Sequence, residues 1–184
     1  METSVTYTSF AGTTHLSSGD LRTMLLATKT YLDGEAAEPV LIFEDQTGQQ
    51  VDFDFRGTPD DVLRRNEPAA KPAPGPGRPK LGVVPREVTL LPRHWEWLER
   101  QPSGISAALR RLVEEAIKRN PGEEQTRRAR EAASRFLWSM AGNLPNFEET
   151  TRALFGGDQS RLEELTSDWP ADIRRHLLKM LTPT

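Results

Sequence analysis

The feature that most constrains this chain is a proline-rich stretch, residues 67–82, in which five of sixteen residues are proline. Proline lacks a backbone donor and fixes φ, so such a run suits neither a helix interior nor a central strand. Its prolines favour extended polyproline II geometry, and the stretch is expected to act as a linker. The sequence therefore predicts separate folded parts on either side of it.

The segment after the linker, residues 83–120, has the pattern of a short strand followed by two helices. The strand is expected to end at Leu91, where Pro92 suits the first turn of a helix. Leu91, Trp95 and Leu98 then recur at helical spacing.

The turn after this first helix lies at residues 102–104, PSG, and either Ser103 or Ser106 is expected to cap the second helix. The second helix has a continuous apolar side and is expected to stop at residues 120–122, NPG. A unit of about 35 residues cannot bury both apolar faces alone. It must pack on another copy of itself or on the rest of the chain.

The first 66 residues predict a compact β-α-β-β-α domain. Strands are expected at residues 4–10, 39–44 and 50–55, with Val51, Phe53 and Phe55 inward and a hairpin turn at residues 45–48. A helix start is expected at residues 17–20, SSGD, with the helix running to about Tyr31, and a short second helix is expected to reach Arg65.

The last part, residues 121–184, predicts an α-helical subdomain. A long helix is expected over residues 123–141, and a second one is expected to begin at Pro145 or Asn146. Asp158 is expected to cap a third helix, and residues 168–170, DWP, to open the last. The overall expectation is an α+β protein of four parts: domain 1–66, linker 67–82, strand-helix-helix segment 83–120 and helical subdomain 121–184.

Composition argues against several function classes. The chain has no cysteine, no apolar stretch near the ~18 residues of a membrane span, and no signal-peptide pattern, so we expect a cytoplasmic protein without membrane contact. Its three histidines are scattered, and no catalytic, nucleotide-binding or metal-ligand motif is visible. Asp45, Asp52 and Asp54 are interpreted as solvated strand charges. We therefore expect no enzyme, no metal, no cofactor and no small-molecule ligand.

Charge is unevenly distributed along the chain. The net charge is −3, but residues 1–66 hold 5 basic and 11 acidic residues, whereas residues 78–119 hold 9 basic and 5 acidic ones. An excess of positive charge on one segment is the electrostatic footprint of nucleic-acid binding. The same excess would also attract the acidic first part of this chain.

The phrases EVTLLPRHWEWL and ISAALRRLVEEA resemble the strand, first helix and second helix of ribbon-helix-helix DNA-binding units. The resemblance implies a homodimer in which two strands pair antiparallel and enter the major groove of duplex DNA. Two strand registers remain open here. Either Arg86, Val88 and Leu90 face outward, or Glu87 and Thr89 do; neither face is uniformly polar.

The candidate DNA contacts follow from this arrangement. Arg86 and Thr89 are the base-facing candidates, depending on the register. Ser103, Gly104, Ser106 and Arg110 are expected to meet phosphate where the second helix starts. Arg78 and Lys80 lie in the tetrapeptide GRPK, which resembles the core of an AT-hook, an arm that enters the minor groove.

The whole chain also resembles a bacterial family known only as domain of unknown function 2239. The matching phrases include LIFEDQTGQQVDFDFRGTPDDV, GRPKLGVVPREVTLLPRHWEWL and MAGNLPNFEETTRALFGGD. This resemblance implies no activity. A DNA-binding regulator is thus weighed against a non-enzymatic interaction or scaffold protein, in which the strand-helix-helix segment is buried against the C-terminal helices. Burial of Val88 and Leu90 would favour the second interpretation.

Overall fold

The structure is a computed structural model, and it describes residues 5–34, 38–66 and 83–182. The predicted linker, with Arg78 and Lys80, lies outside the described residues. The contacts divide the chain into two compact units. Of the described residues, 5–66 and 125–182 form unit 1, and 83–124 form unit 2.

Unit 1 is built on a four-stranded antiparallel sheet. The strands are β1 (Tyr7–Ala11), β2 (Thr14–Gly19), β3 (Val40–Glu44) and β4 (Gln49–Gln50), in the order β2-β1-β3-β4. Its helices are α1 (Leu21–Asp33), α2 (Pro59–Asn66), α5 (Pro121–Met140, within unit 1 from Gln125 onward), α6 (Phe147–Gly156), α7 (Gln159–Leu165) and α8 (Ala171–Leu181). Together with two helices in unit 2, the described residues thus form a mixed α/β protein with eight helices.

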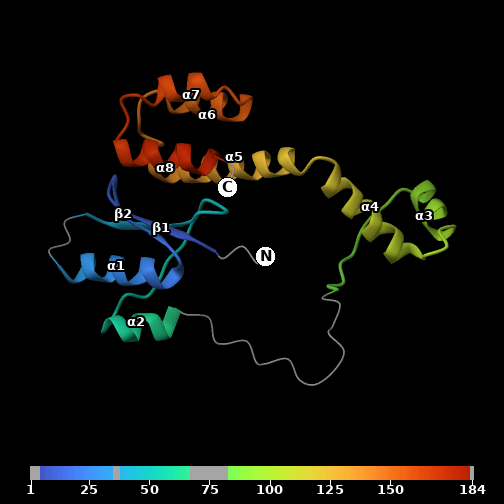
Figure 1. The fold of residues 1–184 in the computed structure, drawn as a ribbon, viewed down its shortest axis with the longest axis horizontal. Helices are drawn as coiled ribbons and strands as arrows, with labels where there is room; N and C mark the ends of the chain where they lie inside the picture. The colour runs from blue at the N-terminus through green and yellow to red at the C-terminus, as the bar shows by residue number, and fades with distance from the viewer. Residues whose placement is uncertain (1–4, 35–37, 67–82, 183–184) are drawn as a thin grey trace. The chain divides into compact units, whose positions relative to one another are not determined.

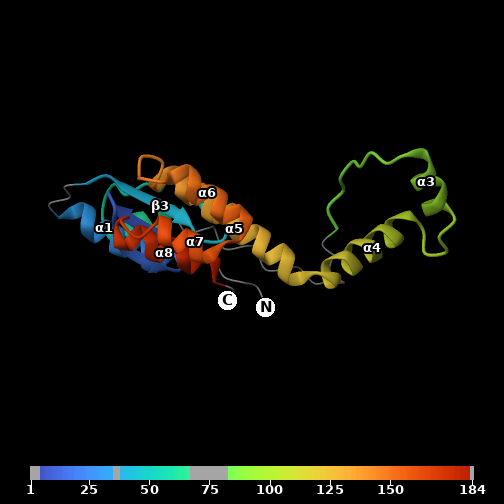
Figure 2. The same cartoon turned by 90° about the horizontal axis from the view of Figure 1, so that it is seen from above.

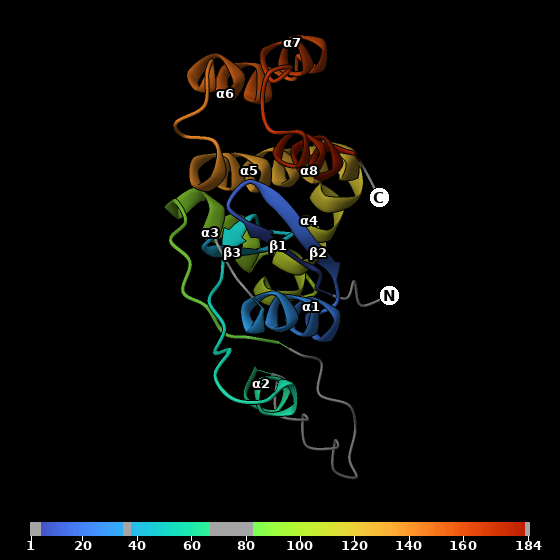
Figure 3. The same cartoon turned by 90° about the vertical axis from the view of Figure 1, so that its left-hand side faces the viewer.

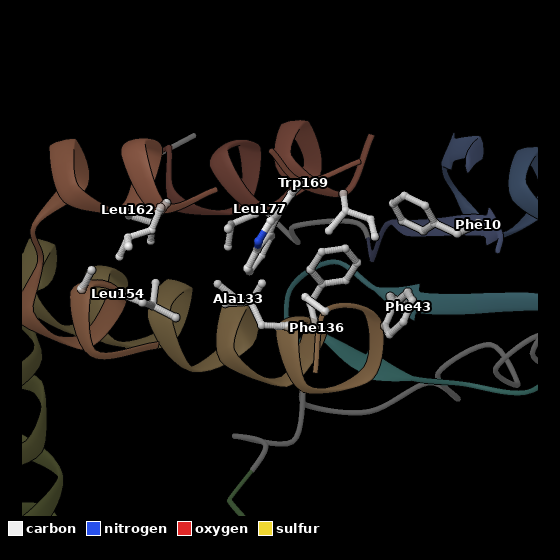
Figure 4. Packing of buried hydrophobic residues seen from close by; sticks show 13 residues of the cluster. Phe10, Phe43, Ala133, Phe136, Leu154, Leu162, Trp169 and Leu177 are labelled. Atoms are coloured by element: carbon white, nitrogen blue, oxygen red, sulfur yellow. The ribbon is translucent and has the colours of Figure 1, made fainter. Parts of the chain in front are cut away.

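Helices cover both faces of this sheet. Figures 1 and 3 show α1 and α2 on one side and α5 and α8 on the other, with α6 and α7 farther out. Side chains alternate along a strand, so Phe10 of β1 and Phe43 of β3 point toward α5 and α8. There they join Phe136 and Leu177 in the larger core, which extends to Leu154 and Leu162 (Figure 4).

The opposite face of the sheet packs on α1 and α2 through a smaller core. Met24 and Leu25 of α1 meet Ile42 of β3 and Val62 of α2, and all four side chains are buried. The near-continuous apolar sequence of residues 40–43 fits a strand that is buried on both faces. Unit 1 therefore combines the predicted N-terminal domain and the predicted helical subdomain in one compact body, where we expected two.

The turn between β3 and β4 lies very close to α5. Gly48 has φ +65°, and a Cβ atom there would lie 1.9 Å from the carbonyl oxygen of Ala132. Arg135 Nη1 also donates a hydrogen bond of 2.8 Å to the carbonyl oxygen of Thr47. Only glycine combines this backbone conformation with this approach. The turn thus fixes where the sheet meets α5.

The structure differs from the sequence expectation at two strands. Residues 14–16 had no assigned element, but they open β2, which continues to Gly19 before Asp20 caps α1 with a 2.7 Å bond from the Thr23 amide. The strand expected at residues 50–55 shrinks to β4 (Gln49–Gln50), because the backbone pairing with β3 ends with the 2.9 Å hydrogen bond from the Val51 amide to the Ile42 carbonyl oxygen. Val51, Phe53 and Phe55 still pack on the smaller core, so their inward orientation is confirmed.

Unit 2 contains an extended segment and two helices. Residues 83–91 lead into α3 (Pro92–Glu99), and a short turn joins α3 to α4 (Ile105–Arg119), as Figure 2 shows. Pro92 occupies the first turn of α3 as predicted. The two helices pack on each other, and Leu98 of α3 and Ala108 of α4 are the two buried residues of this unit among those described.

Candidate nucleic-acid interface

The predicted strand before Pro92 is not a strand within this chain. Residues 83–91 form neither a helix nor a strand, and they pair with no strand of the described sheet; Leu91, at their end, has extended backbone angles (φ −67°, ψ 150°). At the end of this segment, the carbonyl oxygen of Leu91 accepts hydrogen bonds from the amides of His94 (2.8 Å) and Trp95 (3.3 Å), where α3 begins. A strand needs a partner for its backbone groups, and no described segment provides one here.

Side-chain exposure leaves both predicted registers open. Arg86, Glu87 and Thr89 are exposed, and so is Val88, at 55%. Leu90 is half-buried, whereas the neighbouring Leu91 is 51% exposed. Neither face of the segment is therefore covered. The burial of Val88 that would have favoured the scaffold interpretation is not found.

The start of α4 differs from the prediction in its capping residue. Gly104 occupies the N-cap position, with φ +76° and ψ 160°, and no side chain caps the helix. The expected cap by Ser103 or Ser106 is therefore wrong. Because glycine offers no side-chain oxygen, the first amides of α4 receive no bond from a capping side chain.

These amides lie in a shallow open pocket of about 500 Å³. The pocket brings together four predicted phosphate contacts, Ser103, Gly104, Ser106 and Arg110, and adds a carboxylate, Glu99. Glu99 was missed because it ends the preceding helix, and only the turn brings it beside α4. Uncapped helix amides, two hydroxyl groups and a guanidinium form an arrangement that suits an anion, and Glu99 restricts where that anion can lie.

Arg86 and Thr89, the base-facing candidates, lie on the extended segment and do not line this pocket. Among the described residues, neither Arg86 nor Arg110 forms an ion pair, whereas Arg111 faces Glu115 (3.8 Å) and Lys118 faces Glu114 (4.0 Å) on α4. The two unpaired guanidinium groups are therefore the better candidates for an external anion.

The apolar side of α4 is uncovered. Leu112, Val113 and Ile117 are 41%, 57% and 59% exposed, although their spacing places them on one side of the helix. Trp97 of α3 adds a further apolar surface at 47% exposure. Within unit 2 itself, no described element covers most of the apolar surface predicted from its sequence.

Unit 1 holds a polar network that was not apparent in the sequence. Ser18 Oγ lies 2.7 Å from His15 Nε2 and 2.8 Å from Thr8 Oγ1, and Thr8 donates to Asp45 Oδ1 at 2.7 Å. Because Thr8 gives its hydrogen to the carboxylate, Ser18 must donate to Thr8, and His15 Nε2 must donate to Ser18. His15 therefore acts as a donor toward Ser18, which is the reverse of a base that activates a serine nucleophile.

The network ends beside a buried histidine. His176 of α8 is 5% exposed, packs against the rings of Phe10 and Phe136, and has its Nε2 atom 3.9 Å from Asp45 Oδ1. Burial lowers the pKa of His176 to about 4, although Asp45 opposes this shift. The sequence contained one signal of this burial, because His176 follows Ile173 by three residues and precedes Leu177 on the apolar side of the last helix.

The described residues show neither a metal cluster nor a membrane span. No group of three or more His, Asp or Glu side chains is placed to hold a metal ion there. In the same residues, no helix is both long and apolar enough to cross a membrane.

The profile of one protein family matches residues 6–181, and that family is described as an uncharacterized protein conserved in bacteria (DUF2239). The match covers nearly the whole chain, so the chain belongs to this family. No curated protein and no solved structure matches it.

Proposed function

We propose that this member of the DUF2239 family is a DNA-binding regulatory protein that acts as a homodimer through unit 2. The observation that carries the proposal is the combination of an exposed segment without helix or paired strand, residues 83–91, with a helix pair whose apolar side is exposed. Both features belong to unit 2, and one partner could satisfy both of them. A second copy would supply a strand for the first and an apolar surface for the second.

Symmetry supports a second copy over an unrelated protein as that partner. In a two-fold dimer the same surface meets itself, so an extended segment pairs antiparallel with its twin. The same axis would bring the apolar sides of the two α4 helices together, with Leu112, Val113 and Ile117 between them. The dimer would then bury the side chains that a single copy leaves in water.

The charged groups suit DNA as the ligand of such a dimer. A two-stranded ribbon fits the major groove, where Arg86 would hydrogen-bond a base edge in one register and Thr89 in the other. The pocket at the start of α4 would receive a backbone phosphate on each side, with Arg110 as its cation. Arg78 and Lys80 would extend the contact into the adjacent minor groove, as an arm that precedes the ribbon.

The test is a fluorescence-anisotropy titration of the full chain with a random-sequence duplex at several salt concentrations. We expect binding that weakens as salt rises, because each neutralised phosphate releases a counterion. Arg110→Ala should lower the slope of log K against log salt by about 2, one phosphate for each protomer. Arg152→Ala is the matched control, since Arg152 pairs with Glu149 on α6 of unit 1.

Light scattering on the same samples tests the dimer separately. A monomer at all concentrations would remove the ribbon, and with it the proposal. A dimer that binds no duplex at low salt would instead favour the interaction or scaffold protein as the alternative function. A salt slope that changes equally in Arg110→Ala and Arg152→Ala would show that the pocket is not the phosphate site.

A further inference from the structure

A second pocket lies in unit 1, among the four helices α5, α6, α7 and α8. Its volume is about 190 Å³. One wall is apolar, with Leu154 from α6, Leu162 from α7 and Leu181 from α8, whereas Thr126 and Gln159 add polar groups. Two charged residues line it, Arg130 and Asp158. The pocket thus combines an apolar wall with polar groups, among them one cation and one carboxylate.

The carboxylate of Asp158 is already engaged. Its Oδ1 atom accepts the amide of Arg161 at 2.9 Å and so caps α7. Its backbone amide donates to the carbonyl oxygen of Ala153 at 3.1 Å. Asp158 therefore acts as a helix cap, and no ion pair joins it to Arg130 across the pocket.

Arg130, in contrast, is poorly satisfied. Its Nη1 atom makes one long hydrogen bond, 3.4 Å, to the carbonyl oxygen of Phe155. Within the described residues no carboxylate forms an ion pair with it. A guanidinium has five N–H donors, so most of those of Arg130 are not taken by protein groups and stay available to a ligand.

The chain also makes room for this guanidinium. Gly157 follows α6 with φ +74°, and a Cβ atom there would lie 2.4 Å from Arg130 Nη2. Any other residue would push the guanidinium away from the rim of the pocket. The backbone turn and the cation are thus fitted to each other, although the cation gains only one weak bond within the protein.

We propose that this pocket binds a short-chain aliphatic carboxylate. The two oxygens of a carboxylate match the fork of the Arg130 guanidinium, which binds such groups through paired hydrogen bonds. The alkyl tail would lie on Leu154, Leu162 and Leu181. A cavity of about 150 Å³ accommodates benzene, so 190 Å³ suits a ligand of roughly six to eight non-hydrogen atoms.

This site is independent of the proposed DNA binding, because all of its lining residues belong to unit 1. A failure of the proposed dimer would therefore leave the proposed carboxylate site untouched, and the reverse also holds. The absence of a ligand-binding motif in the sequence is understandable, since the lining residues come from four helices that only the fold brings together.

The test is an NMR titration of the ¹⁵N-labelled, methyl-labelled full chain with hexanoate. We expect saturable shifts at Arg130 Nε and at the methyl groups of Leu154, Leu162 and Leu181. Butyrate should bind more weakly because its tail is shorter, and decanoate because its tail exceeds the pocket. Arg130→Gln should weaken hexanoate binding at least tenfold. Arg161→Gln is the matched control, since Arg161 pairs with Glu164 on α7 and does not line the pocket.

Charge-reversed and tail-free probes make the test decisive. Hexylammonium should not compete with hexanoate, and inorganic phosphate should bind at least tenfold more weakly. Absence of saturable hexanoate binding, or equal binding of hexylammonium, would overturn the proposal. Equal binding of phosphate would remove the role of the apolar wall. If Arg130→Gln does not fold, the chain-length series on the unmodified protein still decides.

Discussion

The two units of this protein treat their apolar side chains in opposite ways. In unit 1, Phe10, Phe43 and Phe136 are completely buried, and helices cover both faces of the sheet. In unit 2, helices of comparable amphipathic pattern bury only Leu98 and Ala108 among the described residues. An apolar periodicity thus predicts which side of a helix will be buried. It does not predict whether the residues that bury it belong to the same chain.

The largest effect on stability should come from removing an aromatic ring from the core of unit 1. Phe136→Ala should lower the free energy of unfolding by about 3–5 kcal/mol, because the neighbouring rings of Phe10 and Phe43 cannot fill the cavity. Urea denaturation followed by circular dichroism measures the change. Phe155→Ala is the control, because Phe155 is 52% exposed and should change stability by less than about 0.5 kcal/mol.

A backbone clash in the same unit should have a slightly smaller effect. Gly48→Ala places a methyl group against the Ala132 carbonyl and requires φ +65°, so we expect a loss of about 3 kcal/mol. Gly156→Ala is the control, because nothing lies within 4 Å of a Cβ atom at this position, and it should not lower the free energy of unfolding. Equal stabilities of the two variants in urea denaturation would show that the turn does not touch α5.

Acid should weaken unit 1 through His176. The unfolded chain takes up a proton near pH 6.5, whereas burial holds the pKa of His176 at about 4 in the folded state. Stability is therefore complete above the unfolded pKa and falls as pH drops from about 6.5 to about 4, by roughly 2–3 kcal/mol from this group.

The surrounding charges are Asp45, which opposes the shift, and Lys179 and His15, which strengthen it. Denaturation midpoints of the protein and of His176→Gln, measured at about pH 7.5 and pH 4.5, check this contribution. The variant should show the smaller pH dependence. The exposed His94 provides the control as His94→Gln, and an equal pH dependence in all three proteins would contradict the assignment to His176.

The smallest effect on stability should come from the exposed side of unit 2. This variant separates the stability of one copy from the affinity between two copies. Ile117→Ser removes a side chain that is 59% exposed, so it should change the free energy of unfolding of a single copy by less than about 0.5 kcal/mol. If two copies pair through this surface, the same variant should weaken the dimer at least tenfold in sedimentation experiments. A large loss of monomer stability would show that Ile117 is covered within one chain.

Local rules explain what was predictable in this fold. Asp158 caps α7 and Pro92 opens α3 as expected, because each residue acts through its own backbone neighbourhood. The helix start expected at residues 17–20 narrows to Asp20, which caps α1. The elements that were missed depend on distant partners. β2 exists because residues 14–19 pair with β1, and the expected strand at 50–55 is short because its backbone bonds to β3 end at Val51.

The sites follow the same division. Ser103, Gly104, Ser106 and Arg110 are close in sequence, so a single turn was enough to anticipate their meeting. His15, Asp45 and His176 come from three distant segments, and no spacing rule connects them. Charge was also a poor guide to the pocket of Arg130, since the exposed and the half-buried arginines of α5 look alike in the sequence.

Unit 2 interrupts unit 1, whose two segments, residues 5–66 and 125–182, lie on either side of it along the chain. A ribosome releases the chain from the N-terminus, so β1 and β3 emerge long before Phe136 and Leu177. During that interval Phe10 and Phe43 have no helix to lie against, while the whole of unit 2 has already been synthesised. One apolar face of the sheet is therefore exposed during synthesis, where chaperones can bind it. Unit 1 can complete its fold only after the last helix has been synthesised.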